Sequence, residues 1–284
     1  MPSTPALTIV IPCYNEEKYI TKAIESLLHQ SFTDFRAVIS DNASTDETVK
    51  LAKSAINGDS RFEVICQQKN IGSAGNLKFL LTCAQTEFFM FLGAHDFLSK
   101  GYLDICVSSI RSRPDVSIAT TRAIGVDESD ALNYHRFLEM YDFSQESPVV
   151  RYIESVAKLE HCTCLQGVVR THQIRLANIK PIASNDHIII SRLLWYGKLK
   201  YTEGEAYYRR YFTNREQSYM ERITGSSNSE IDRGPFIDEY VKDFNRLFAG
   251  EDHIRVFLNH IILEILHARF GKPMVPLGHK IEIR

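Results

Sequence analysis

The sequence lacks any long hydrophobic run. None of its 284 residues belongs to a stretch approaching the ~18 apolar residues that a membrane-spanning helix needs. The first five residues carry no basic side chain, so we expect no secretory signal peptide. The formal net charge is only −2, which gives no general attraction to nucleic acid. These absences exclude the integral membrane class and argue against a nucleic-acid-binding protein.

The cysteines show no pattern typical of disulfides or of a zinc finger. The six cysteines mostly lie within apolar segments, where reduced core thiols are expected. We therefore expect a cytoplasmic protein, located in the cytosol or at the inner face of the membrane. His161, Cys162 and Cys164 stand close together, but no second pair follows at the spacing of a zinc finger. We expect a strand here rather than a set of zinc ligands.

Two common phosphate-binding loops are also missing. No Gly-x-Gly-x-x-Gly follows the first predicted strand, which argues against a nicotinamide dehydrogenase, and no Gly-Lys-Ser/Thr occurs. A nucleotidyltransferase should carry a glycine-rich loop with an early Lys or Arg, where this chain has Pro12 to Glu16. Something else must then neutralise a phosphorylated ligand, and a divalent cation held by the last of the polar turns is the most economical candidate.

Short apolar runs alternate with amphipathic segments through the first hundred residues. The runs predict strands at 7–12, 35–40, 62–66 and 88–92, and residues with helical spacing follow each of the first three. Thr45 is the expected N-cap of the second helix. The alternation predicts a doubly wound, mostly parallel α/β sheet with helices on both faces.

In such a sheet, ligands bind beyond the carboxyl ends of the strands. Polar turns follow the four predicted strands at 12–16, 41–44, 70–76 and 93–96, and should meet in one crevice. Asp41 could accept hydrogen bonds from a base or ribose, and His95 and Asp96 could hold a cation. Each has a simpler alternative: Asp41 could serve its turn alone, and His95 and Asp96 could cap the next turn.

These turns carry a family resemblance. The segments 8–16, 23–32, 41–46 and 70–76 together resemble the opening half of the family 2 glycosyltransferases, and residues 160–212 do so more faintly. The resemblance implies a GT-A fold and an inverting transfer of a sugar from a nucleotide-diphosphate sugar, with UDP as the expected nucleotide. The implied acceptor is a hydroxyl of a glycan or lipid-linked oligosaccharide, in surface polysaccharide biosynthesis.

The resemblance also assigns site residues. The nucleotide-binding residues implied by motif match are Pro12, Tyr14, Glu16, Asp41, Asn42, Asn70, Asn76 and Ala94. Family members usually carry Asp-x-Asp where this chain has Gly93-Ala94-His95-Asp96, which makes His95 and Asp96 the expected ligands of Mn²⁺ or Mg²⁺. An imidazole ligand favours Mn²⁺. The missing first carboxylate leaves a non-catalytic nucleotide-sugar-binding module as the alternative function.

The second half of the chain supplies the expected catalytic base. In the family, an acidic residue at the position of Asp186 removes the proton of the acceptor hydroxyl, although an acidic residue heading a helix could also simply cap it. Arg170, Arg209 and Arg210 are candidates for phosphate or acceptor contacts, or else structural residues. Residues 124–148 look like a variable insertion, either covering the acceptor side or forming a surface excursion.

The C-terminal part has a different character. Residues 225–230 form a predicted hinge, and two amphipathic helices are predicted after it. We therefore divide the chain into a catalytic domain at 1–223 and a helical extension at 224–284. The two helices could pack on the core, form a homodimer or lie at a membrane surface.

Overall fold

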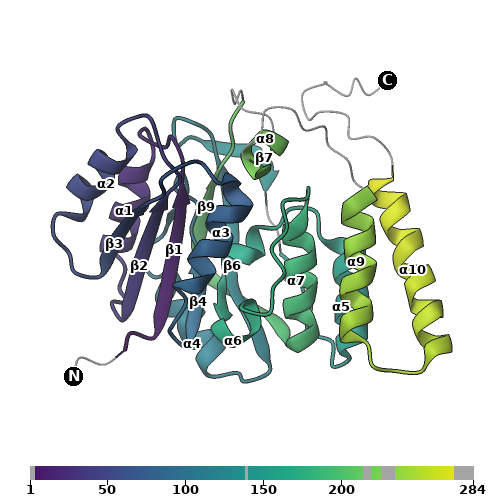
Figure 1. Ribbon diagram of the computed structural model, residues 1–284. Helices are drawn as coiled ribbons and strands as arrows, with labels where there is room; N and C mark the ends of the chain where they lie inside the picture. Colours follow the sequence, from purple (N-terminus) through teal and green to yellow (C-terminus); the bar gives the residue numbers. More distant parts are fainter. Residues whose placement is uncertain (1–3, 138–139, 214–218, 225–233, 272–284) are drawn as a thin grey trace.

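The first half of the chain forms the parallel part of a nine-stranded sheet (Figure 1). The structure is a computed structural model, and it describes residues 4–137, 140–213, 219–224 and 234–271. Parallel pairing gives the order β3-β2-β1-β4. The strands are β1 (Leu7–Cys13), β2 (Phe35–Asp41), β3 (Phe62–Cys66) and β4 (Phe88–Phe91). The four strands predicted from the apolar runs are thus confirmed.

Helices connect these strands as the alternation predicted. They are α1 (Ile20–Leu28), α2 (Thr48–Ile56) and α3 (Gly72–Thr82). The prediction that Thr45 caps α2 is wrong, because the helix begins three residues later. There the Asp46 carboxylate accepts a hydrogen bond from the backbone N–H of Thr48, at 3.0 Å.

The second half of the sheet is mixed. Strand β8 pairs antiparallel with both β4 and β6, and β9 runs parallel to β6 and antiparallel to β5. The elements are β5 (Phe97–Leu98), α4 (Tyr102–Arg111), β6 (Val116–Val126), β7 (Leu132–Phe137), α5 (Pro148–Lys158), η1 (Thr163–Gln166), β8 (Val168–Arg170), α6 (Thr171–Ile174), α7 (Asn185–Tyr196), β9 (Lys198–Arg210) and α8 (Tyr219–Thr224).

Two expectations for this half need correction. The strand expected from His161 onward begins only at Val168, because Thr163–Gln166 form a turn of 3₁₀ helix. The expected insertion at 124–148 starts inside the sheet, since β7 pairs with the end of β6 as a hairpin. Phe143, near its other end, is fully buried and forms a bridge with Leu199 of β9.

Apolar side chains fill both faces of the sheet. On one face, Leu7, Ile9 and Ile11 of β1 pack with the buried sides of α1, α2 and α4. On the other face, Val10 and Phe89 pack with α3 and α7. Because successive strand residues point to opposite faces, this alternation requires helices on both sides, which confirms the predicted layers.

The C-terminal helices α9 (Gly234–Leu247) and α10 (Asp252–Phe270) stand beside α5 at the end of the molecule remote from β3 (Figure 1). They form a third apolar cluster with α5 and α7, in which Phe236, Tyr240 and Phe244 are fully buried. Packing on the core therefore accounts for α9, whereas Val256 and Phe257 of α10 are exposed. The homodimer and the membrane contact stay predictions.

The domain boundary at residues 223 and 224 also stays a prediction. It falls near the end of α8, and the hinge predicted at 225–230 lies outside the described residues. Within the described part of the chain, no helix combines the length and the apolar character that crossing a membrane requires.

Candidate functional site

A large cleft opens at the carboxyl ends of the parallel strands. Its volume is about 910 Å³, which is ample for a nucleotide sugar. The predicted site residues that line it are Pro12, Tyr14, Glu16, Asn42, Asn70, Asn76, Ala94, His95 and Asp186. The structure thus brings all four predicted turns, and the start of α7, to one cleft.

Side-chain amides hold the turns of this cleft together. Asn42 Nδ2 donates to Asn70 Oδ1 at 2.8 Å, while Asn42 Oδ1 accepts the backbone N–H of Ile71 at 2.9 Å. Asn15 Oδ1 accepts the backbone N–H of Thr45 at 2.9 Å, which joins the first turn to the second. Such contacts fix loops whose backbone groups would otherwise lack partners.

Asn76 and Asp41, two further predicted nucleotide-binding residues, also have structural contacts. Asn76 is buried and bonds to Ser40 twice, accepting from its hydroxyl at 2.5 Å and donating to its carbonyl at 3.0 Å. Asp41 is also buried, and its Oδ2 accepts the backbone N–H of Ser44 at 3.0 Å. The contact with Ser44 is that of the turn role, while Asp41 Oδ1 accepts the thiol of Cys13 at 3.8 Å, and Asp41 is not among the residues that line the cleft.

His95 faces the cleft and contacts the first turn. Its Nδ1 lies 2.8 Å from Glu16 Oε1, and Phe212 packs against its ring edge-on with centroids 5.1 Å apart. Both Glu16 and Phe212 also line the cleft. The side chain of His95 is therefore held by the first turn and by the segment after β9.

Asp96 is buried and lies outside the lining of the cleft. Its Oδ1 accepts the backbone N–H of Arg210 at 2.8 Å, and its Oδ2 accepts the hydroxyl of Tyr207 at 2.6 Å. These bonds occupy one lone pair on each oxygen, and Oδ1 lies 3.9 Å from His95 Nε2. The pair fits a divalent cation only if the two groups move closer and a bound nucleotide supplies further ligands.

A residue that the sequence analysis did not find, Arg222 of α8, lines the cleft beside the start of α3. Gly72 allows this arrangement: its φ is +71°, and a Cβ there would lie 2.6 Å from the carbonyl oxygen of Ile223. Only glycine combines that backbone conformation with so close an approach. Gly72 therefore lets α8 pack over the N-terminus of α3.

Lys180 is a second cation of the cleft that the sequence analysis missed. Its ammonium pairs with Glu239 Oε2 at 2.5 Å, and Glu239 in turn accepts from Arg246 at 2.9 Å. Burial alone would raise the pKa of Glu239, but the bonds to Lys180 and Arg246 hold it below its usual value. Helix α9 thus positions a positive charge at the cleft. Neither Lys180 nor Arg222 belongs to a motif that could have revealed it.

Asp186 lies in the first turn of α7 and lines the cleft, partly exposed. Its Oδ1 accepts the first-turn N–H of His187, at 3.2 Å, and the N-cap residue Ser184 makes no side-chain capping bond. Asp186 is therefore not the N-cap residue, although its carboxylate bonds to the first turn as an acidic residue heading a helix commonly does. The buried thiol of Cys162 faces it, and burial together with the Asp186 charge raises the pKa of that thiol.

The three candidate arginines lie outside the lining of the cleft. Arg170 donates to the carbonyls of Ile110, Arg113 and Val116, at 2.8 to 2.9 Å. Arg210 donates to the carbonyl of His95 at 3.0 Å and pairs with Asp130. These bonds tie backbone segments together, so Arg170 and Arg210 have structural contacts in place of phosphate or acceptor contacts.

Arg209 interacts electrostatically with the catalytic candidate Asp186. Its Nη1 donates to Thr163 Oγ1 at 2.7 Å. Burial would lower its pKa, but the nearby Tyr211, Asp96, Tyr207 and Asp186 raise it, so the guanidinium is charged. It is the positive charge that faces Asp186 from β9.

Several curated bacterial proteins are similar to this chain. The Staphylococcus epidermidis teichoic acid poly(glycerol phosphate) polymerase is 38% identical over 172 residues, covering 60% of this chain and 23% of that protein. The Escherichia coli chondroitin synthase is 34% identical over 116 residues, covering 40% of this chain and 16% of that protein. The chain thus spans less than half the length of these relatives.

Solved structures share the fold over nearly the whole chain. The S. aureus TarS fragment 1–349 in complex with UDP-GlcNAc matches with a TM-score of 0.68 and 20% identity, covering 94% of this chain and 73% of that one. The same fragment in complex with UDP matches with a TM-score of 0.67. The predicted GT-A fold is thereby confirmed. The family model described as "Glycosyl transferase family 2" matches residues 8–167, more than half of the sequence, and the chain therefore belongs to that family.

Proposed function

We propose that this protein is an inverting glycosyltransferase that moves a sugar from a nucleotide-diphosphate sugar to an acceptor hydroxyl. The observation that carries the proposal is the position of Asp186. Asp186 lines the cleft formed by the four strand-end turns, and it lies within the first turn of α7, beyond the N-cap position that Ser184 occupies. A base and a donor pocket in one cleft are what a single displacement needs.

UDP is the nucleotide we expect. The TarS structures of the same fold are complexes with UDP-GlcNAc and with UDP, which supports a uridine nucleotide here. The walls of the cleft carry Lys180 and Arg222, whose charges suit a diphosphate. Tyr14 and Asn42, from the first two turns, are the proposed contacts to the base and ribose.

Asp186 would remove the proton of the acceptor hydroxyl as that oxygen attacks the anomeric carbon. The new bond between oxygen and carbon forms as the bond from that carbon to the diphosphate oxygen breaks, so the configuration inverts. The proton passes to an Asp186 oxygen, and the electron pair leaves with the nucleoside diphosphate. Lys180 and Arg222 would stabilise the charge that develops on the leaving group.

Members of this family generally use a divalent cation. We propose that His95 Nε2 and Asp96 Oδ1 hold it, with Mn²⁺ preferred over Mg²⁺ because one ligand is an imidazole. When bound, the ion would neutralise the diphosphate. The two oxygens of Asp96 already accept hydrogen bonds, so the ion should bind weakly until a nucleotide completes its ligands.

For the acceptor we propose a glycan or a lipid-linked oligosaccharide. This proposal rests on the similarity to a chondroitin synthase and to a teichoic acid polymerase, both of which by name make long polymers. Surface polysaccharide biosynthesis is the corresponding cellular role.

The function is tested by measuring nucleotide release from a panel of sugar nucleotides with Mn²⁺ and bacterial-type glycan acceptors. We expect UDP release from at least one donor that depends on the acceptor. If UDP-sugars bind but none is turned over with any acceptor, the chain is instead a nucleotide-sugar-binding module. The departure at Gly93 is the observation that favours this second function.

A further inference from the structure

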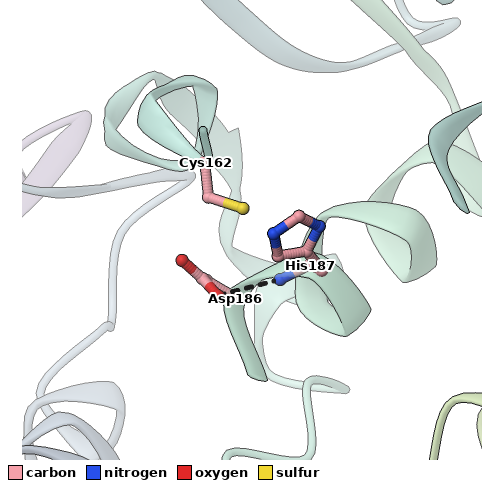
Figure 2. Close-up of side chains that lie close together, drawn as sticks. All are labelled: Cys162, Asp186 and His187. Carbon is pink, nitrogen blue, oxygen red and sulfur yellow. Dashed lines mark hydrogen bonds between the residues drawn. The ribbon is translucent and has the colours of Figure 1, made fainter. Parts of the chain in front are cut away.

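Three side chains that can bind a metal meet beside the cleft. Cys162, Asp186 and His187 each offer one ligand atom, and these three atoms all lie within 4.8 Å of one another. Figure 2 shows the sulfur of Cys162, just before η1, directed toward the carboxylate and the ring at the start of α7. His161 and Cys164 are the neighbours of Cys162 in the sequence, whereas the fold brings Cys162 two possible ligands from another element, α7.

The chemistry of this cluster suits a thiophilic divalent cation. A thiolate, an imidazole nitrogen and a carboxylate oxygen are all ligands of Zn²⁺. The thiolate and the carboxylate would together neutralise its two positive charges. In a tetrahedral zinc site the ligand atoms lie about 3.3 to 3.7 Å apart, so the cluster must close by about 1 Å. The partly exposed Asp186 can supply that movement by rotating its side chain.

We propose that Cys162, Asp186 and His187 form a reversible Zn²⁺ site, which is distinct from the cation site at His95 and Asp96. Zinc bound there prevents Asp186 from acting as a base and so inhibits the enzyme. Binding would replace the thiol proton of Cys162 by the metal, with one proton released to the solvent. The inhibitory part rests on the proposed function, whereas the binding part does not.

The three ligands differ in burial, and this difference fits a metal site with one open coordination position. Cys162 and His187 are each only 6% exposed, so the protein core fixes them. The His187 ring packs edge-on against Phe236 and Phe270, with centroid distances of 6.1 and 5.5 Å. Asp186 lines the cleft. A metal would therefore enter from the cleft and keep its fourth position on that side.

One neighbouring charge opposes the metal. The Arg209 guanidinium interacts electrostatically with both Cys162 and Asp186. A cation beside a cation is unfavourable, so Arg209 should hold the affinity of the site down. This predicts a site that binds and releases zinc, in contrast to the permanent zinc of a structural site.

The binding test is a titration of the full, reduced chain with Co²⁺, which reports a thiolate ligand through its charge-transfer absorption. We expect one equivalent to give this band, and Zn²⁺ to abolish it by displacement. Cys162→Ser should remove the band. The matched control Cys164→Ser, a buried thiol two residues away, should keep it, as should Cys66→Ser at an exposed thiol. A band that persists in Cys162→Ser, or that is absent from the unmodified protein, would overturn the site.

A second variant is expected to bind Zn²⁺ more tightly. Because misfolding would weaken binding, a gain of affinity cannot be caused by misfolding. Arg209→Gln removes the opposing charge, and we expect Zn²⁺ to bind it several-fold more tightly by calorimetry. Unchanged or weaker binding would contradict the proposed position of the metal.

The inhibitory part is tested once a donor and an acceptor are turned over. Micromolar Zn²⁺ should inhibit the unmodified enzyme, and Cys162→Ser should be much less sensitive, each relative to its own zinc-free rate. Equal sensitivity would show that zinc acts elsewhere. If no donor is turned over, the cobalt spectrum still decides whether the site exists, so failure of the function and failure of the site are distinguishable.

Discussion

The carboxylate of Asp96 occupies the space that a side chain at position 93 would need. A Cβ built on Gly93 would lie 2.4 Å from Asp96 Oδ2. Tyr207 and the backbone of Arg210 hold that carboxylate in place. The missing first acid of the Asp-x-Asp pattern and the buried position of Asp96 are therefore linked, because the carboxylate of Asp96 can lie where it does only if residue 93 is small.

This relationship predicts that restoring the family pattern will do harm. Gly93→Ala should lower the free energy of unfolding by about 1–3 kcal/mol, because it forces a methyl group against a fixed carboxylate. Gly93→Asp should destabilise more, since it adds a second negative charge beside Asp96. Urea denaturation measures both. A Gly93→Asp variant that is as stable as the unmodified protein and binds Mn²⁺ more tightly would contradict this account.

His95 should be needed for metal-dependent nucleotide binding. His95→Ala removes the ligand that faces the cleft, so we expect the enhancement of UDP affinity by Mn²⁺ to fall at least several-fold. His172→Ala, at an exposed histidine of α6, is the matched control and should have no effect. Calorimetry of UDP binding with and without Mn²⁺ measures this. An undiminished Mn²⁺ effect in His95→Ala would remove His95 from the metal site.

Lys180 should contribute to donor binding through its charge. Lys180→Gln is expected to raise the KM for the donor roughly tenfold, the effect of losing one charge-assisted hydrogen bond to a phosphate. Lys158→Gln, on the exposed side of α5, is the control. Steady-state kinetics with the donor varied gives the answer. An unchanged KM would mean that the diphosphate lies elsewhere in the cleft.

Glu239 should make stability depend on pH. Its pKa is lower in the folded protein than in the unfolded chain, because Lys180 and Arg246 outweigh the effect of burial. Its contribution to stability is therefore present above the unfolded pKa and is lost as the pH falls through the folded value. Glu239→Gln should cost about 1–3 kcal/mol at pH 7 and less near pH 3.

Urea denaturation at the two pH values measures this difference. Asp238→Asn, at the exposed neighbouring position of α9, should cost little at either pH. A loss of stability in Glu239→Gln that is the same at both pH values would show that its ion pairs contribute nothing.

The fold was largely predictable because local patterns determine it. The runs at β1, β2 and β4 are buried along almost their whole length, as parallel strands inside a sheet must be, whereas the edge strand β3 exposes Glu63 and Cys66. Each turn after these four strands is polar. The start of α2 was not predictable to the residue, because Thr45 and Asp46 are both good capping residues. The choice depended on the contact of Thr45 with Asn15, thirty residues earlier in the chain.

The site was predictable where its residues follow a strand or, as with Asp186, where they match the family pattern. Pro12, Asn42 and His95 line the cleft because they sit at strand ends. The orientation of Asp96 depends on Tyr207, which is 111 residues away, and no pattern near Asp96 encodes that contact. Lys180 is held by Glu239, on a helix that the sequence assigned to an extension. Long-range contacts of this kind need the folded chain.

The most direct test of the account compares Asp186→Asn with the unmodified enzyme in turnover and in UDP binding. We expect turnover to fall by about 10²- to 10⁴-fold while UDP affinity changes less than twofold, because the base acts on the acceptor and not on the nucleotide. Asp104→Asn is the matched control, since Asp104 also lies in the first turn of a helix but outside the cleft. If Asp186→Asn retains turnover, or loses turnover and UDP binding together, Asp186 is not the base.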